Sequence, residues 1–323
     1  MATVGGSPHS VAFGVADGVG GWQDQGVDPS DFSHGLCGFM AGTAHLHGAE
    51  GEETEGKGAI RPRDLMQTAY NAVMGNPRIV AGGCTASLGV LDGQGELEVA
   101  KYVPHLHSST KSNPPIDNSH PNSLGDSGLL IISPGKITFR SPPQTHAFNT
   151  PYQMSKLPAK LQAQHAIFGS THFSETPQDA DVTTHKVSHG DIVLFATDGV
   201  WDNLSTQDTL RIITKVMEEN GYWFRSEGAE TRVNETMVKE IPGQVTGKAQ
   251  ESYLPGLLAA AVMREAKVAG LDRRRQGPFA KEVKRVYPSE PWEGGKPDDI
   301  AVVVAVAVEN GHLAENGPVR AKL

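Results

Sequence analysis

Aspartates stand at the ends of the most apolar stretches of this 323-residue chain. Each adjoins a short apolar run that is typical of a buried strand: Asp17, Asp126, Asp198, Asp298 and Asp299. Glycine follows Asp17 and Asp198, and a glycine lets the backbone approach a ligand closely. If these strand ends lie on one side of a fold, four or five carboxylates converge, and their repulsion favours a bound cation.

The chemistry of such a cluster follows from its ligands. Carboxylate oxygens are hard ligands, so they suit Mg²⁺ or Mn²⁺ rather than Zn²⁺. Two such ions ~3.5–4 Å apart can activate a water and clamp a phosphoryl oxygen. The alternative is that each Asp-Gly pair is only a turn. That alternative weakens when several pairs each adjoin a core strand, although spacing alone leaves convergence open.

The elements that must position these acids can be predicted from periodicity and turn residues. Helices are predicted over 30–46, 62–74, 205–219 and 257–268. Strands are predicted over 11–16, 84–92, 96–100, 129–133, 136–140, 190–198 and 300–308. Residues 142–177 are predicted to form a long irregular excursion. Strands that are apolar on both faces must be covered on both faces, so the pattern indicates a layered α+β domain.

Composition excludes several classes of function. Lys and Arg total 28 against 37 Asp and Glu, and a net charge of −9 argues against a nucleic-acid partner. No stretch approaches ~18 consecutive apolar residues, so no membrane span is expected. Cys37 and Cys84 are the only cysteines, which is too few for a disulfide framework.

Five segments, in this order, resemble the motifs of the metal-dependent Ser/Thr protein phosphatases of the protein phosphatase 2C type. They are VADGVGGW (15–22), GCTASLGVLD (83–92), LGDSG (124–128), FATDGVWDN (195–203) and GKPDDIAVV (295–303). Residues 17–30 and 146–154 are most similar to the small mitochondrial branch of that family. The resemblance implies one phosphatase domain over 1–323, a four-layer α/β/β/α sandwich of two mainly antiparallel sheets flanked by helices.

The same resemblance implies the activity: a dinuclear Mg²⁺ or Mn²⁺ centre hydrolyses phosphoserine and phosphothreonine in proteins with a metal-activated water. Carried over by motif, Asp17 would bridge both ions and Gly18 would bind through its carbonyl. Asp198 and Asp298 would bind one ion, so the catalytic set is Asp17, Asp198 and Asp298. No organic cofactor is implied.

A weaker third ion is also implied. Asp126 and Asp202 match its carboxylates, together with Asp198. Asp299 stands where the family often has Asn, so we expect it behind the ligands rather than among them. The implied partner is a phosphoprotein and the implied state a monomer. The branch implies mitochondrial residence; residues 1–10 show no presequence, and without one the expectation is cytoplasmic.

Three departures from the family pattern stand out. Val19 occupies the position where much of the family has a proposed His general acid, and His146 is a speculative replacement. The family's N-terminal strand, with its acidic and basic residues, is predicted to be missing. Residues 101–123 replace a single Asn and contain four prolines, which cannot continue a central strand. We interpret this segment as a non-native insertion, a translated short intron.

These departures keep a second function open: a catalytically impaired, phosphatase-like binding or scaffold protein. The retained acids oppose it, because nothing structural requires so many clustered carboxylates. A third possibility is another dinuclear hydrolase, such as a phosphodiesterase. Those enzymes usually mix His with carboxylate ligands, and no matching His motif is present.

Overall fold

The computed structural model describes residues 2–7, 10–50, 60–102, 127–158, 175–225, 230–234, 237, 254–309 and 319–322. The chain divides into two compact units, each containing one large sheet. Unit 1 comprises Met1–Leu91, Glu98–Lys111 and Gln144–Thr184, and unit 2 comprises Asp92–Leu97, Ser112–Pro143 and His185–Leu323. One domain over 1–323 stays a prediction. Among the described residues, no helix has the length and apolarity that crossing a membrane requires.

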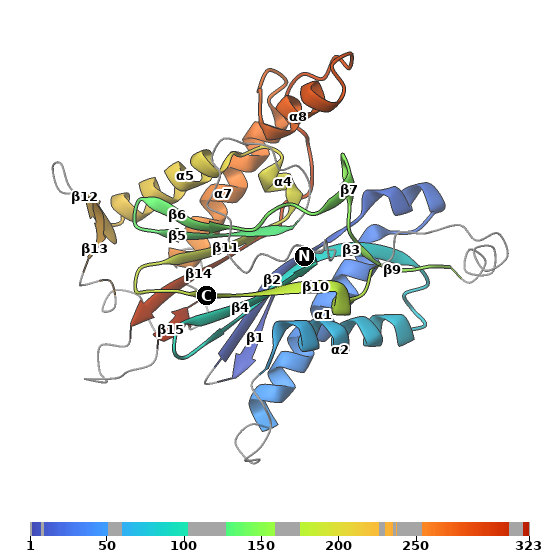
Figure 1. The fold of residues 1–323 in the computed structure, drawn as a ribbon, viewed down its shortest axis with the longest axis horizontal. Helices are drawn as coiled ribbons and strands as arrows, with labels where there is room; N and C mark the ends of the chain where they lie inside the picture. Colours follow the sequence, from blue (N-terminus) through green and yellow to red (C-terminus); the bar gives the residue numbers. More distant parts are fainter. Residues whose placement is uncertain are drawn as a thin grey trace, which may run out of the picture. The chain divides into compact units, whose positions relative to one another are not determined.

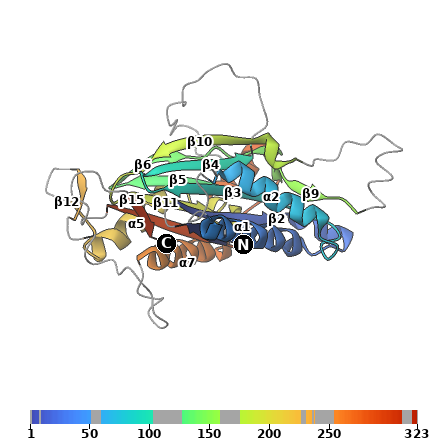
Figure 2. The same cartoon turned by 90° about the horizontal axis from the view of Figure 1, so that it is seen from below.

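Unit 1 is a sheet packed against two helices. Its strands follow the order β1 (Ala2–Ser7), β2 (Ser10–Gly18), β3 (Gly82–Asp92), β4 (Glu96–Tyr102) and β10 (Ala180–Lys186), with β9 (Met154–Lys156) beside β3. Helices α1 (Pro29–Glu50) and α2 (Pro62–Gly75) lie side by side, and α1 packs on β1 and β2 (Figures 1 and 2). Strand β3 is buried except at its last residue, as its apolar sequence predicts.

The core of unit 1 confirms the helical pattern seen in the sequence. The apolar stripe of α2 is buried: Leu65, Met66, Ala69, Tyr70 and Val73. Pro62 stands at the first position of this helix, where its missing N–H costs nothing. Both cysteines are thiols buried in this core. Burial raises the pKa of the Cys37 thiol to about 11, so its role is packing.

The N-terminal strand that we predicted to be missing is partly present. Strand β1 pairs antiparallel with β2 along its whole length, from Ala2 opposite Val15 to Ser7 opposite Ser10. The sheet therefore has an edge strand before β2, and that part of the prediction is wrong. The segment ATVGGS contains no acidic or basic residue, so the family's charged pair is absent from β1.

Unit 2 is built from a second antiparallel sheet and its helices. The strand order is β15 (Val319–Lys322), β14 (Val302–Glu309), β11 (Ile192–Ala196), β5 (Gly128–Ser133) and β6 (Lys136–Arg140). Helices α5 (Thr206–Glu219) and α7 (Leu254–Leu271) pack on each other, and α7 also packs on β14. All five residues of β11 are buried. Strands β14 and β5 flank it, and Ile192, Leu194 and Ala196 pack in one core with residues of α5 and α7.

Local sequence signals place the start of α5 correctly. Ser205 caps the helix: its hydroxyl accepts from the Asp208 backbone N–H at 3.1 Å, and the Asp208 carboxylate accepts from the Ser205 N–H at 3.1 Å. Ser205 and Asp208 therefore form a capping box. The predicted α+β class, with mainly antiparallel sheets and flanking helices, is confirmed.

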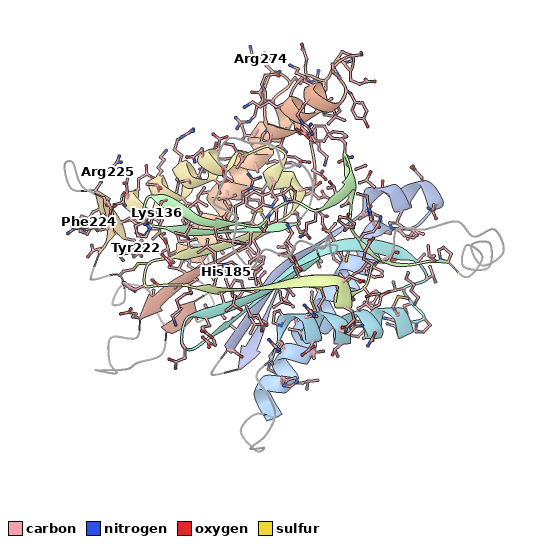
Figure 3. All side chains as sticks on the ribbon, in the orientation of Figure 1. Lys136, His185, Tyr222, Phe224, Arg225 and Arg274 are labelled. Carbon is pink, nitrogen blue, oxygen red and sulfur yellow. The ribbon has the colours of Figure 1, made fainter. Side chains whose placement is uncertain are left out.

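Other elements were not anticipated. Strand β10 is mostly exposed and polar, so no apolar alternation marks it. The irregular excursion contains short strands β7 (Thr145–Ala147) and β8 (Thr150–Pro151) besides β9. Unit 2 adds helix α8 (Pro278–Val286) and a hairpin of β12 (Trp223–Arg225) and β13 (Thr231–Val233), around which Figure 3 labels Tyr222, Phe224 and Arg225. Residues 103–126, which include most of the predicted insertion, lie outside the described residues.

Candidate metal centre

The first two acids of the site stand one helical turn apart in unit 2. Strand β11 ends at Ala196, and the short helix α4 (Asp198–Trp201) begins two residues later. The backbone N–H of Asp202 donates to the carbonyl of Asp198 at 2.8 Å. Residues four apart on a helical turn share a face, so both carboxylates project from the same side.

The third acid, Asp298, lies in the segment that precedes β14, far from Asp198 in the sequence. Strand β14 runs antiparallel to β11, with Ala196 opposite Val302, so the residues before β14 lie beside the residues after β11. The backbone N–H of Thr197 donates to the Ala301 carbonyl at 3.1 Å, and the Thr197 hydroxyl accepts from the Ala301 N–H at 3.0 Å. This pairing brings Asp298 back to the start of α4.

A glycine makes that return possible. A Cβ atom on Gly199 would lie 2.3 Å from the carbonyl oxygen of Asp299 and 3.0 Å from the Ile300 side chain. Any larger residue would push the returning segment away. Gly199 therefore allows a second backbone segment to pack closely, whereas the sequence suggested a close approach to a ligand.

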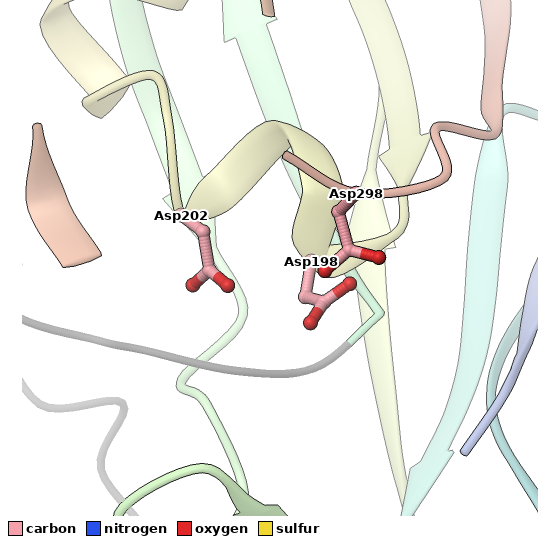
Figure 4. Close-up of side chains that lie close together, drawn as sticks. All are labelled: Asp198, Asp202 and Asp298. Carbon is pink, nitrogen blue, oxygen red and sulfur yellow. The ribbon is translucent and has the colours of Figure 1, made fainter. Parts of the chain in front are cut away.

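The three carboxylates form one cluster, shown in Figure 4. Asp198, Asp202 and Asp298 each offer one carboxylate oxygen, and these atoms all lie within 4.8 Å of one another. The Asp202 side chain has no exposure, whereas the side chains of Asp198 and Asp298 are 22% and 31% exposed. Of the strand-end acids predicted to converge, Asp198 and Asp298 thus lie close together, and Asp202 joins them.

Lys296 enters the same cluster. Its ammonium lies 2.8 Å from Asp198 Oδ2, 2.6 Å from Asp202 Oδ2 and 2.9 Å from Asp298 Oδ2. Sequence reasoning missed this residue. The available signal was a single lysine two positions before Asp298, inside a Gly- and Pro-containing loop.

Burial and like charge dominate the electrostatics of the cluster. Burial, reinforced by the neighbouring Asp198 charge, raises the pKa of Asp202 to about 7, although Lys296 acts in the opposite direction. Burial alone would lower the pKa of Lys296. The carboxylates of Asp202, Asp198 and Asp298 outweigh that effect and raise the pKa of Lys296 above its ordinary value, so it stays protonated.

The donor set fits a hard divalent cation. All three ligands are carboxylates, which suit Mg²⁺ or Mn²⁺. Asp202 Oδ1 is buried and has no hydrogen-bond partner among the described residues, an arrangement that costs free energy unless a cation or water satisfies it. When all three carboxylates are ionised, the ammonium leaves a net charge of −2, which one divalent ion would cancel.

The remaining predicted ligands are not tested by this cluster. Asp17 and Gly18 belong to unit 1, at the end of β2, so their approach to the other acids stays a prediction. Asp126 lies outside the described residues. Asp299 is exposed, and its backbone N–H donates to Asp298 Oδ1 at 2.9 Å, so its backbone supports the ligand.

The candidate proton donor also lies in unit 1. His146 Nε2 stands 2.8 Å from Glu175 Oε1, and its ring contacts Tyr152 with centroids 3.8 Å apart. Its proposed role stays a prediction. Trp201, in helix α4 between Asp198 and Asp202, is buried, and its indole N–H donates to the Ala196 carbonyl at 2.8 Å.

No protein-family model matches the chain. It is 31% identical over 297 residues to the protein phosphatase PTC7 homolog of Danio rerio, covering 92% of this chain and 77% of the relative. It is 28% identical over 296 residues to the mitochondrial protein phosphatase 2C homolog 7 of Saccharomyces cerevisiae, covering 92% and 70%. Among solved structures, the photosystem II phosphatase PBCP matches with a TM-score of 0.60 and 23% identity, over 95% of this chain and 90% of that one. That structural match supports the fold.

Proposed function

The chain belongs to the protein phosphatases of the 2C type, in the branch of the PTC7 homologues, and on this premise we propose that it dephosphorylates phosphoserine and phosphothreonine in proteins with the help of Mg²⁺ or Mn²⁺. The observation that carries the proposal is the cluster of Asp198, Asp202 and Asp298. Sequence similarity alone would not require these acids to meet, and their meeting supplies the oxygen ligands that the reaction needs.

The residues divide the work as follows in this proposal. Asp198, Asp298 and Asp17 would hold one ion, and Asp17 and the Gly18 carbonyl would hold a second. Such ions would supply a polarised water and neutralise charge on the phosphoryl oxygens. Thr197 and Gly199 keep the ligands in place through their contacts with the segment before β14. Catalysis of this kind depends on positioning and charge stabilisation.

The proposed partner is a phosphoprotein, and the proposed state is a monomer. We place the protein in mitochondria, because the yeast relative carries that location in its name. Val19, at the position of the family's proposed general acid, leaves the proton for the departing serine or threonine to come from another group.

The test is hydrolysis of p-nitrophenyl phosphate and of matched phosphoserine, phosphothreonine and phosphotyrosine peptides with millimolar Mn²⁺. We expect activity on the first three substrates, its loss on chelation, and a fall of at least ~100-fold in kcat for Asp198→Asn, since metal charge stabilisation is worth several kcal/mol. Asp181→Asn is the matched control, because Asp181 is exposed on the edge strand β10.

An inactive wild-type protein would contradict the proposal. If that protein still bound phosphopeptides, the catalytically impaired binding or scaffold function would replace it. Activity restricted to phosphodiesters would instead point to a different dinuclear hydrolase.

A further inference from the structure

Lys296 is held in place from several sides, so its position in the acid cluster is specific. Its backbone N–H donates to Asn203 Oδ1 at 2.9 Å, and its carbonyl accepts from Asn203 Nδ2 at 2.8 Å. The same Asn203 amide donates to the Gly199 carbonyl at 3.0 Å. One buried side chain therefore ties the lysine backbone directly to helix α4.

The loop that carries Lys296 is also packed tightly against α7. A Cβ atom on Gly295 would lie 2.1 Å from the Ala269 carbonyl oxygen, and one on Gly270 would lie 3.0 Å from the Lys296 carbonyl oxygen. Glycine at both positions allows this approach. This packing restricts movement of the loop and therefore keeps Lys296 near the acid cluster.

An aromatic side chain supports the ammonium as well. Lys296 Nζ stands 5.3 Å from the centroid of the Phe279 ring, within the range of a cation–π interaction. The Phe279 ring in turn packs edge-on against Trp292, with centroids 4.8 Å apart. The charged group is thus enclosed by three carboxylates and a ring face.

The three carboxylates are not equivalent partners for it. The shortest contact, 2.6 Å, is to Asp202, whose side chain is fully buried. Asp198 and Asp298 are partly exposed, so an ion that arrives from solvent reaches their oxygens first. Because the ammonium contributes one positive charge to three carboxylates, one divalent ion completes the charge balance and two would exceed it.

From this geometry we infer that Lys296 is a built-in cation that occupies the Asp198–Asp202 part of the cluster, where the sequence resemblance implies a third metal ion. One divalent ion then binds at Asp198 and Asp298. The inference rests on the proposed function for the presence of metal, and it assigns Lys296 the role of a positioning residue.

The test compares the full chain with Lys296→Met, which keeps the side chain's length and removes its charge. Thermal unfolding in excess chelator and Mn²⁺ stoichiometry by equilibrium dialysis are measured for both. We expect the metal-free variant to unfold ~5 °C lower, because removing one partner leaves uncompensated buried charge. We also expect it to bind one more Mn²⁺ ion per chain and to gain more stability from Mn²⁺ than the wild type.

Lys215→Met is the matched control, because Lys215 is a 71% exposed lysine that pairs with Glu219 at 3.8 Å on α5. It should leave the melting temperature and the stoichiometry unchanged. Equal melting temperatures and equal stoichiometry for wild type and Lys296→Met would overturn the inference.

A second variant covers the case in which Lys296→Met fails to fold. Combining it with Asp202→Asn removes both charges of the shortest pair, and we expect this double variant to be folded and more stable than Lys296→Met alone. Absence of that rescue contradicts the inference. Neither measurement requires turnover, so an inactive wild type would end the proposed function without deciding the role of Lys296.

Discussion

Two of the three Asp-Gly pairs in the chain, Asp17-Gly18 and Asp198-Gly199, have the same local chemistry and different surroundings. Asp17-Gly18 ends β2 in unit 1, and Asp198-Gly199 follows β11 in unit 2. A Cβ atom would lie 2.2 Å from the Pro29 carbonyl oxygen at Gly18 and 2.3 Å from the Asp299 carbonyl oxygen at Gly199. Because glycine has no Cβ atom, a second backbone segment can pack directly against each of these turns.

The backbone segments that pack against these two glycines differ. The segment at Gly18 is the start of α1, and a 3-10 helix, Gly20–Gln25, lies between them in the sequence. At Gly199 it is the loop that carries Asp298, and α4 adds Asp202 one turn later. Each Asp-Gly pair thus allows close backbone packing, and at Gly199 the packed segment also supplies a further carboxylate.

The largest effects should come from the acids themselves. Asp17→Asn and Asp298→Asn should each lower kcat/KM with Mn²⁺ by at least ~100-fold, if both turns serve one metal centre. Asp299→Asn should change it less than ~3-fold, because the Asp299 side chain is exposed and its backbone makes the contact. Kinetics on a phosphothreonine peptide measures all three. Full activity of Asp17→Asn would show that the Asp17 turn of unit 1 has no part in catalysis.

The next effects concern the two glycines. Gly18→Ala and Gly199→Ala should each lower the free energy of unfolding by ~1–3 kcal/mol, because the new methyl group collides with backbone that cannot move freely. Denaturant unfolding measures both. Gly38→Ala is the control: Gly38 is exposed on α1 with open space around it, so alanine should stabilise by up to ~1 kcal/mol. Equal stability of Gly199→Ala and wild type would show that the return loop can relax.

The smallest predicted effect is a difference between the two glycine variants in the reactivity of the Cys37 thiol. Because burial raises the pKa of Cys37 to about 11, its side chain is almost entirely the neutral thiol at pH 8, and the thiol is shielded. Native protein should therefore react slowly with a thiol reagent at pH 8, and faster as pH rises. Gly18→Ala displaces the start of α1 and should speed this reaction, whereas Gly199→Ala should not. Equal labelling rates in the two variants would contradict this assignment.

Much of the fold could be predicted from local pattern. Strand β11 and helices α2 and α5 appear where apolar runs and helical periodicity place them. Strand β10 was missed, because an exposed edge strand needs no apolar alternation. Strand β1 was also missed: ATVGGS is a weak strand sequence, and its pairing with β2 is a tertiary interaction.

The amino-acid sequence alone determined which residue types are available for metal chemistry, and where strands give way to Asp-Gly turns. Tertiary structure decided which of those acids meet, since the antiparallel pairing of β11 with β14 joins residues about 100 positions apart. It also placed Lys296 among them, and no spacing rule could predict this, because the contact depends on how the loop after α8 packs against Asn203 and α7. Local interactions depend on residues that are close in the sequence, whereas charge compensation between distant segments occurs only in the folded chain.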